Sequence, residues 1–202
     1  MRVSKTLFAA VFMLFLTLPA IAGNILKDNS YSEITNNSKV VQALNLMDGT
    51  SASWAKKAIL GNNDSGLPMK IEFKHLADIS PDYANFDALG WKKGRQLYIY
   101  VNEKHKNAPV EALASLLSHE SVHQDAYCSL EEETYAWGYE ADVWTQMKAK
   151  NPRAAQIKCP LTERLNTLSR LFTSANHTTS SIRKLVYSNP GYKGLPLHSP
   201  GF

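Results

Sequence analysis

The chain has 202 residues, and 44% of them are hydrophobic, which is enough for one domain with a sizeable buried core. Lysine and arginine together number 22 against 18 aspartates and glutamates, giving a formal net charge of +4. This small excess is not gathered into a basic run, so the composition argues against a nucleic-acid-binding protein.

Residues 1–22 have the composition of a signal peptide. Arg2 and Lys5 form a positively charged start, Leu7–Leu18 is an apolar run, and a small-residue cleavage motif ends at Ala22. The run is shorter than the roughly 20 residues that span a bilayer, so we predict cleavage after Ala22 and not a retained anchor. Cleavage removes Arg2 and Lys5, which lowers the formal charge from +4 to +2. The product is expected to be secreted or periplasmic, without a membrane span.

Two short helices and three strands are expected in the first half of the remaining chain. Ser38–Met47 carries apolar residues on one helical face, and Ser51–Leu60 ends at a Gly- and Asn-rich break. Met69–His75 alternates apolar and polar residues, Phe86–Trp91 is a candidate second strand, and Gln96–Asn102 is rich in aromatic and β-branched residues. The strands predict a small antiparallel sheet.

The second half is expected to be helical. The pattern predicts helices over Pro109–Ala126, over Ser129–Lys150, which starts with a Ser-x-x-Glu capping box, and over Leu161–Ser174. Residues 177–202 contain repeated proline and glycine and are expected to form an extended tail. The sequence therefore predicts an α+β fold with one domain over residues 23–176, in which the sheet packs on a helical core.

The motif H-E-x-x-H stands in the first of these helices, as His119, Glu120 and His123. Two histidines four residues apart lie on the same face of a helix, so both imidazoles can reach one metal ion. Glu120 lies beside that face, where a metal-bound water would be, and is the candidate general base. This arrangement predicts a single catalytic Zn²⁺, for which a third protein ligand is needed.

The third ligand is expected on the following helix. If the two helices are antiparallel around the turn before Ser129, Glu133 is the carboxylate nearest to both histidines, and we predict His119, His123 and Glu133 as the ligands. Glu132 is an alternative, although its capping role competes with metal binding. Glu140 is a second alternative, which lies nearer the level of Leu117 and is better suited to accept a hydrogen bond from His119.

These residues resemble the gluzincin class of zinc metallopeptidases, which combine H-E-x-x-H with a glutamate on the next helix, often as E-x-x-A. The resemblance covers residues 110–147 and is closest to small metallopeptidases with S-x-x-E-E-x-x-A-W after the histidines. It implies a zincin-like core and a strand above the active helix that holds substrate by β-augmentation. Gln96–Asn102 has the right place in the chain for that strand. The matching positions are Ser129, Glu132, Glu133, Ala136 and Trp137.

The motif and the resemblance together predict an exported zinc metallopeptidase that acts on peptides or proteins. The alternative is a zinc-binding exported domain without turnover, with a role in binding or in the structure of the cell envelope. A third interpretation keeps the helix pair as a structural element without metal.

Cysteines and histidines outside this site are assigned structural roles. Cys128 and Cys159 are the only cysteines, and in an exported protein such a pair predicts a disulfide. His75 and His105 lie in or after strands and are expected at the surface, where histidine is often found.

Overall fold

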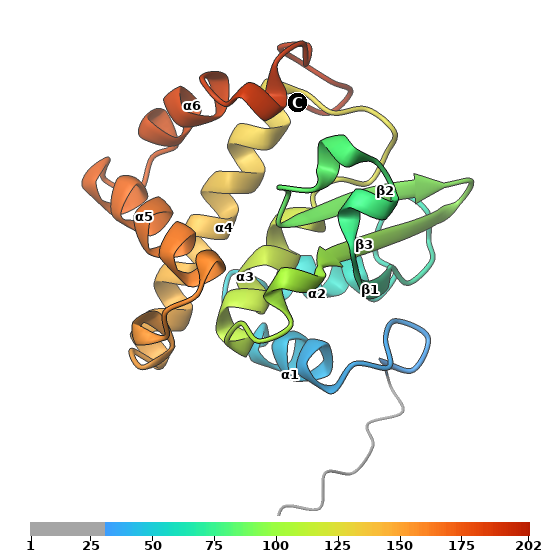
Figure 1. Ribbon diagram of the computed structural model, residues 1–202, viewed down its shortest axis with the longest axis horizontal. Helices are drawn as coiled ribbons and strands as arrows, with labels where there is room; N and C mark the ends of the chain where they lie inside the picture. Colours follow the sequence, from blue (N-terminus) through green and yellow to red (C-terminus); the bar gives the residue numbers. More distant parts are fainter. Residues whose placement is uncertain (1–30) are drawn as a thin grey trace, which may run out of the picture.

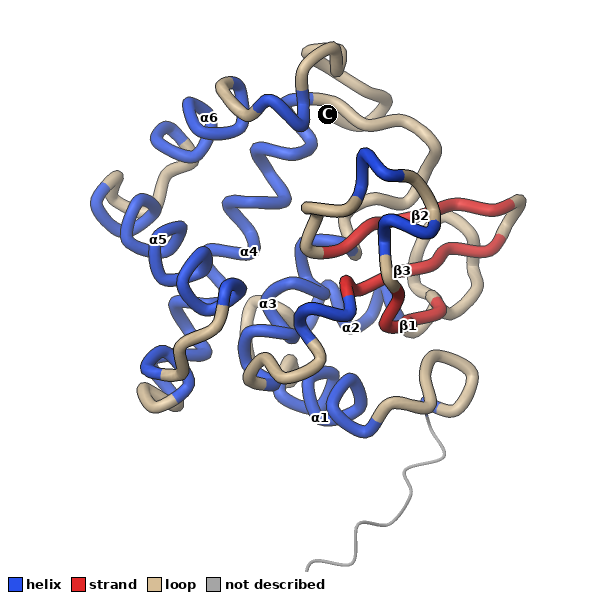
Figure 2. The backbone as a smooth tube through the Cα atoms, viewed as in Figure 1, coloured by secondary structure: helices blue, strands red, loops and turns tan. Residues whose placement is uncertain are grey.

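The computed structural model describes residues 31–202, so the predicted signal peptide lies outside the described residues. Other helices pack against the long helix α4 (Leu130–Lys150), while three strands lie together at one side (Figure 1, Figure 2). Among the helices of residues 31–202, none is long and apolar enough to cross a membrane. The helices are α1 (Ser38–Leu46), α2 (Ser53–Ile59), α3 (Val110–Glu120), α4 (Leu130–Lys150), α5 (Pro160–Ser174) and α6 (Ser180–Tyr187).

The sheet is mixed, with strand order β1-β3-β2. β1 (Lys70–Lys74) is parallel to β3 (Gln96–Asn102), and β2 (Ala88–Lys93) is antiparallel to β3. The prediction of an antiparallel sheet is therefore correct for the β2–β3 hairpin and wrong for β1. Residues 75–87, which include two short 3-10 turns, carry the chain to the far edge of the sheet before β2 begins. The hairpin then returns β3 into the centre.

Burial explains why β3 is the central strand. Leu97, Ile99 and Val101 point to one face and are fully buried in the main hydrophobic core, which they share with residues of α1 and α3. β2 carries Lys92 and Lys93, both exposed, and lies at the edge of the sheet. Its outer side pairs with no other strand in the part of the chain that the structure describes.

The helical half agrees with the prediction in α4 and α5 and differs from it in two places. α3 ends at Glu120 and not at Ala126. The predicted extended tail is wrong for residues 180–187, which form α6. Ile182 and Val186 of α6 are buried in a small apolar cluster with residues of α4 and α5. Their spacing of four residues was the helical signal in the tail.

The predicted disulfide is absent from the structure, where Cys128 and Cys159 are both free thiols. Cys128 precedes α4, and Cys159 follows it as the residue before α5. Because α4 has 21 residues, it spans about 30 Å at 1.5 Å per residue. Bridged cysteines have Cα atoms only about 4–7 Å apart, and a helix of this length lies between the two cysteines in the chain.

Candidate metal centre

The two histidines of the motif lie at the end of α3 and just beyond it. After the helix ends, the amides of Val122 and His123 donate to the carbonyls of His119 and Glu120, at 3.0 and 3.3 Å. These contacts between residues three apart continue the chain in a tighter turn. The imidazoles therefore stay adjacent, with their Nε2 atoms 3.4 Å apart, although the helix is shorter than predicted.

Glu133 reaches both histidines from the first turn of α4. Its Oε2 lies 3.6 Å from His119 Nε2, and its Oε1 lies 3.5 Å from His123 Nε2. Donor atoms about 2.0–2.1 Å from a tetrahedral zinc lie about 3.4 Å from one another. The distances here are close to that value, although they involve two different Glu133 oxygens, and one donor atom from each residue lies within 4.8 Å of the others. The buried Oε2 also has no hydrogen-bond partner, which leaves an acceptor free for a cation. The structure thus brings together the three residues predicted as ligands.

Glu120 lies beside these donor atoms. Its Oε1 is 3.9 Å from His119 Nε2, and only 5% of the residue is exposed. Burial raises the pKa of Glu120 above its ordinary value, although the two neighbouring histidines partly offset this effect. A carboxylate with a raised pKa is a better proton acceptor near neutral pH, as a general base must be.

Glu132 contacts the outer nitrogen of one ligand histidine. Its amide donates to the Ser129 hydroxyl at 3.1 Å, as the capping prediction requires. Its carboxylate does not complete the capping box: Oε1 lies 2.9 Å from His123 Nδ1, and Oε2 accepts from Ser199 at 3.0 Å. If His123 Nδ1 carries the proton, this contact leaves Nε2 free to bind metal.

Glu140 has the corresponding place behind the other histidine. Its Oε2 lies 3.4 Å from His119 Nδ1, within ion-pair distance but long for a hydrogen bond. The Glu140 side chain is fully buried, and Arg164 of α5 contacts both of its oxygens. Glu132 and Glu140 are therefore placed to orient the histidines, which agrees with the choice of Glu133 as the ligand.

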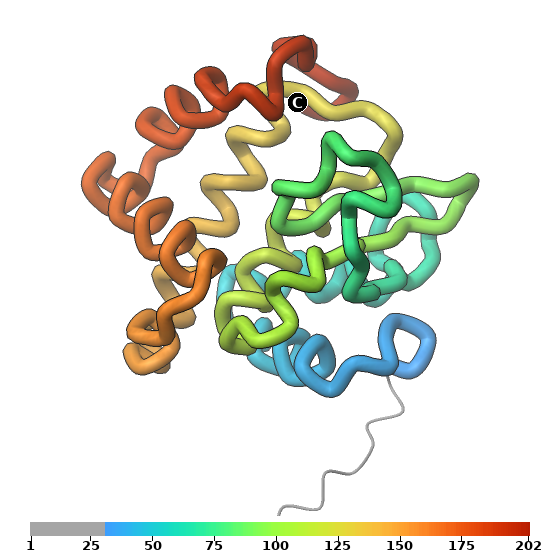
Figure 3. Tube along the Cα trace, viewed as in Figure 1, coloured from blue at the N-terminus to red at the C-terminus, as the bar shows by residue number. Residues whose placement is uncertain are grey.

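Tyr192 also faces the site, and the sequence did not reveal it. This residue lies in a short 3-10 turn, Pro190–Tyr192, in the C-terminal segment, which passes beside the loop that precedes α4 (Figure 3). The Tyr192 hydroxyl accepts from Trp137 Nε1 at 2.9 Å and lies close to the Glu133 carboxylate. Burial and the charge of Glu133 raise the pKa of Tyr192. The hydroxyl therefore stays protonated and can orient Glu133.

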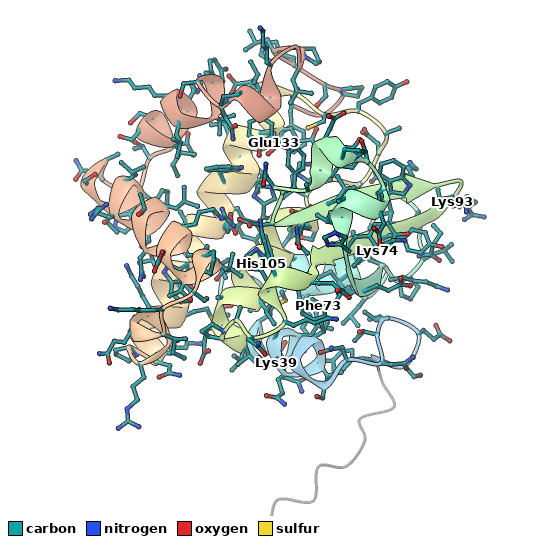
Figure 4. All side chains as sticks on the ribbon, viewed as in Figure 1. Lys39, Phe73, Lys74, Lys93, His105 and Glu133 are labelled. Carbon is teal, nitrogen blue, oxygen red and sulfur yellow. The ribbon has the colours of Figure 1, made fainter. Side chains whose placement is uncertain are left out.

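β2, and not β3, passes over the motif. A Cβ built on Gly90 would lie 2.8 Å from the Cβ of His123 and 3.5 Å from Glu120 Oε2. The expectation that Gln96–Asn102 lies above the active helix is therefore wrong, because that strand is β3, which is paired on both sides. Figure 4 shows Glu133 between α4 and the β2 end of the sheet.

The electrostatics of the site favour positive charge. Burial alone would lower the pKa of His123, but the charges of Glu133 and its neighbours raise it to about 9. The pKa of His119 is also raised, against the effect of burial, chiefly by its contact with Glu140. In turn, these two histidines lower the pKa of Glu133, which burial would raise. Carboxylates therefore hold protons on the rings when no metal is bound.

We expect zinc binding to release a proton and to strengthen with pH. Because metal needs a neutral imidazole, zinc must displace the proton that His123 holds with a pKa of about 9. Affinity should rise by up to about tenfold per pH unit for each ring proton that zinc displaces, and level off at higher pH once both rings are neutral. Competition with a chelator at pH 6.5, 7.5 and 8.5 measures the slope, and calorimetry in buffers of different ionisation enthalpy counts the protons. A flat affinity over this range would contradict the electrostatics described here.

Comparisons with family models, with curated proteins and with solved structures gave no match to this chain. The geometry of the site and the sequence motif are therefore the basis for a function.

Proposed function

We propose that this protein is an exported zinc metallopeptidase that hydrolyses peptide bonds. The observation that carries the proposal is the set of three donor atoms from His119, His123 and Glu133, which lie within 4.8 Å of one another beside the buried Glu120. Two imidazoles and one carboxylate are a donor set that zinc prefers, and they leave a fourth position for water or substrate.

The residues around the site have separate tasks in this reaction. Bound zinc would supply a Lewis acid that polarises the peptide carbonyl and lowers the pKa of water. Glu120 accepts the proton of the attacking water and later returns it to the leaving amine. Glu132 and Glu140 hold the two imidazoles in place, and Tyr192 orients the Glu133 carboxylate.

The free edge of β2 supports an extended peptide as substrate. An edge strand presents unpaired N–H and C=O groups, to which a peptide can add as a further strand. β2 is such an edge, and Gly90 brings its backbone next to Glu120 and His123. A peptide paired with β2 would therefore run past the candidate metal centre.

Gly90→Ala is expected to weaken both zinc binding and hydrolysis. The new methyl group would lie 2.8 Å from His123 Cβ, so either the strand or the histidine must shift. We expect at least about a tenfold loss of zinc affinity, comparable with the loss of an outer-sphere contact. Gly94→Asn is the matched control, since nothing lies within 4 Å of a Cβ there and asparagine tolerates its positive φ. Unchanged affinity in Gly90→Ala would show that β2 does not constrain the site.

The alternative, a zinc-binding domain without turnover, is favoured by the burial of the site. The side chains of His119, His123 and Glu133 are only 7%, 13% and 8% exposed, and closed zinc sites are structural. One preparation separates the two functions. Protein purified without chelator is analysed for zinc and then incubated with an unstructured protein such as reduced casein. Zinc with chelator-sensitive cleavage supports the peptidase, zinc without cleavage supports the alternative, and the absence of zinc contradicts both.

A further inference from the structure

A chain of buried charges extends from the candidate metal centre to the start of β2. Glu140 Oε2 lies 3.4 Å from His119 Nδ1, and Arg164 donates from Nη1 and Nη2 to the two Glu140 oxygens at 2.9 and 2.6 Å. The Nε atom of the same guanidinium lies 2.6 Å from Asp87 Oδ2. One arginine on α5 thus contacts both the carboxylate behind a ligand histidine and the residue that precedes β2.

Asp87 is itself fixed from several sides. Its Oδ1 lies 2.7 Å from Nε2 of His105, which is 1% exposed, so the expectation of a surface histidine at this position is wrong. Lys104 Nζ lies 3.0 Å from the same oxygen, and the Asp87 carbonyl accepts from the amide of Asn102 at the end of β3. The hydrogen bond from His105, together with the charges of Arg164 and Lys104, lowers the pKa of Asp87 despite its burial. The Asp87 carboxylate is therefore negatively charged and held in a fixed position, where it can form an ion pair with Arg164.

The energetics favour a specific role for this arginine. Glu140 is fully buried, and a buried carboxylate without its partner is strongly destabilising. The guanidinium donates to both Glu140 oxygens while its Nε lies at ion-pair distance from Asp87, without the alignment of a hydrogen bond. The single ammonium of lysine cannot reproduce this set of contacts. Arg183, by contrast, contacts Glu131 near the same end of α4 as Glu133 with its own side chain half exposed.

We propose that Arg164 is a positioning residue, which holds the metal ligand His119 and the edge strand β2 in fixed relation to one another. It orients His119 through Glu140 and fixes the start of β2 through Asp87. The inference rests on the proposed zinc site and adds to it a mechanical link: binding of metal restrains the strand that would receive the peptide.

The test compares zinc affinity in the wild type and in Arg164→Gln, Glu140→Gln and the double variant. We expect each single substitution to lower affinity about 10- to 100-fold, as loss of contacts behind a ligand histidine does. Both residues act on His119 through the same Arg164–Glu140 contact. The zinc affinity of the double variant should therefore be no more than about threefold below that of the single variant with the lower affinity. Additive losses would overturn the proposal, and so would wild-type affinity in Arg164→Gln. Arg183→Gln is the matched control and should bind zinc like the wild type.

Two further readouts separate positioning from a general structural role. The visible absorption of the Co²⁺-loaded protein should change in Arg164→Gln, since it reports the geometry of the ligands. Zinc should slow deuterium uptake in residues 88–93 of the wild type, and this protection should vanish in Arg164→Gln even at saturating zinc. Protection that persists in the variant would overturn the link to β2.

Arg164→Lys serves if the glutamine variant does not fold. It keeps the positive charge, but one ammonium cannot reproduce the three contacts, so zinc affinity should still fall at least about fivefold. Wild-type affinity in Arg164→Lys would also overturn the proposal. A wild-type protein that binds no zinc defeats the proposed function, whereas a zinc-binding wild type with unaltered variants defeats this inference alone.

Discussion

Glu120→Gln should abolish nearly all peptide hydrolysis while zinc binding persists. Glutamine has almost the same shape as glutamate but cannot accept a proton from water, so the rate should fall about 10²- to 10⁴-fold, the contribution of a positioned general base. Glu120 Oε1 lies 3.9 Å from His119 Nε2 and is not needed to complete the three-ligand set, so zinc affinity should stay within about threefold. Initial rates on a fluorogenic peptide and a chelator competition measure the two quantities.

Glu111→Gln is the matched control for this prediction, because it makes the same substitution in the first turn of the same helix, away from the site. It should cleave and bind zinc like the wild type. If Glu120→Gln cleaves peptide at the wild-type rate, the mechanism with Glu120 as base is wrong. If it loses zinc instead, Glu120 belongs among the ligands.

Glu133→Ala should remove zinc binding almost completely. The carboxylate contacts both Nε2 atoms, at 3.6 and 3.5 Å, and its loss leaves a two-ligand site. We expect affinity to fall more than about 100-fold, beyond the cost of losing an outer contact. Glu132→Ala, which removes the acceptor behind His123 but leaves all three proposed ligands in place, should cost about 10- to 100-fold. The two variants therefore differ in the size of their effect.

Zinc content and the melting temperature with and without added zinc distinguish these variants. Zinc should raise the melting temperature of the wild type and of Glu132→Ala, but not of Glu133→Ala, because a ligand stabilises only the state that binds it. Glu131→Ala, one residue further from the site in sequence, is the neutral control. A larger loss in Glu132→Ala than in Glu133→Ala would exchange the two assigned roles.

The site was more predictable than the sheet, and the reason is sequence distance. His119 and His123 share one turn, and Glu133 follows them across a short connection between two helices. Rules for residues that share a helix face, and for antiparallel helix pairs, therefore predict that these three side chains lie close together. Local rules also gave the span of α4, with its capping serine at one end and an Asn-Pro stop at the other.

The features that the sequence did not predict depend on contacts between segments that are far apart in the chain. Residues 75–87 decide that β2 lies at the edge, and their irregular composition carries no signal for this path. Arg164 meets Asp87 only because α5 packs back on α4, and Tyr192 reaches Glu133 from the C-terminal segment. Single residues of this kind have no periodic neighbours, so pattern analysis cannot single them out.

The position of β2 at the edge has a consequence for solubility. A strand whose outer side can receive a peptide can also receive the same strand of another copy, which is the first step of edge-to-edge aggregation. Lys92 and Lys93 lie exposed at the outer end of β2, and Figure 4 shows Lys93 projecting at the tip of the hairpin, away from Glu133. Charge at the tip discourages a second sheet, while the uncharged backbone at Gly90 stays open. If β2 receives the substrate as proposed, its two ends would have different tasks: the segment near Gly90 would pair with a peptide, and the lysines at the tip would discourage pairing with a second folded copy.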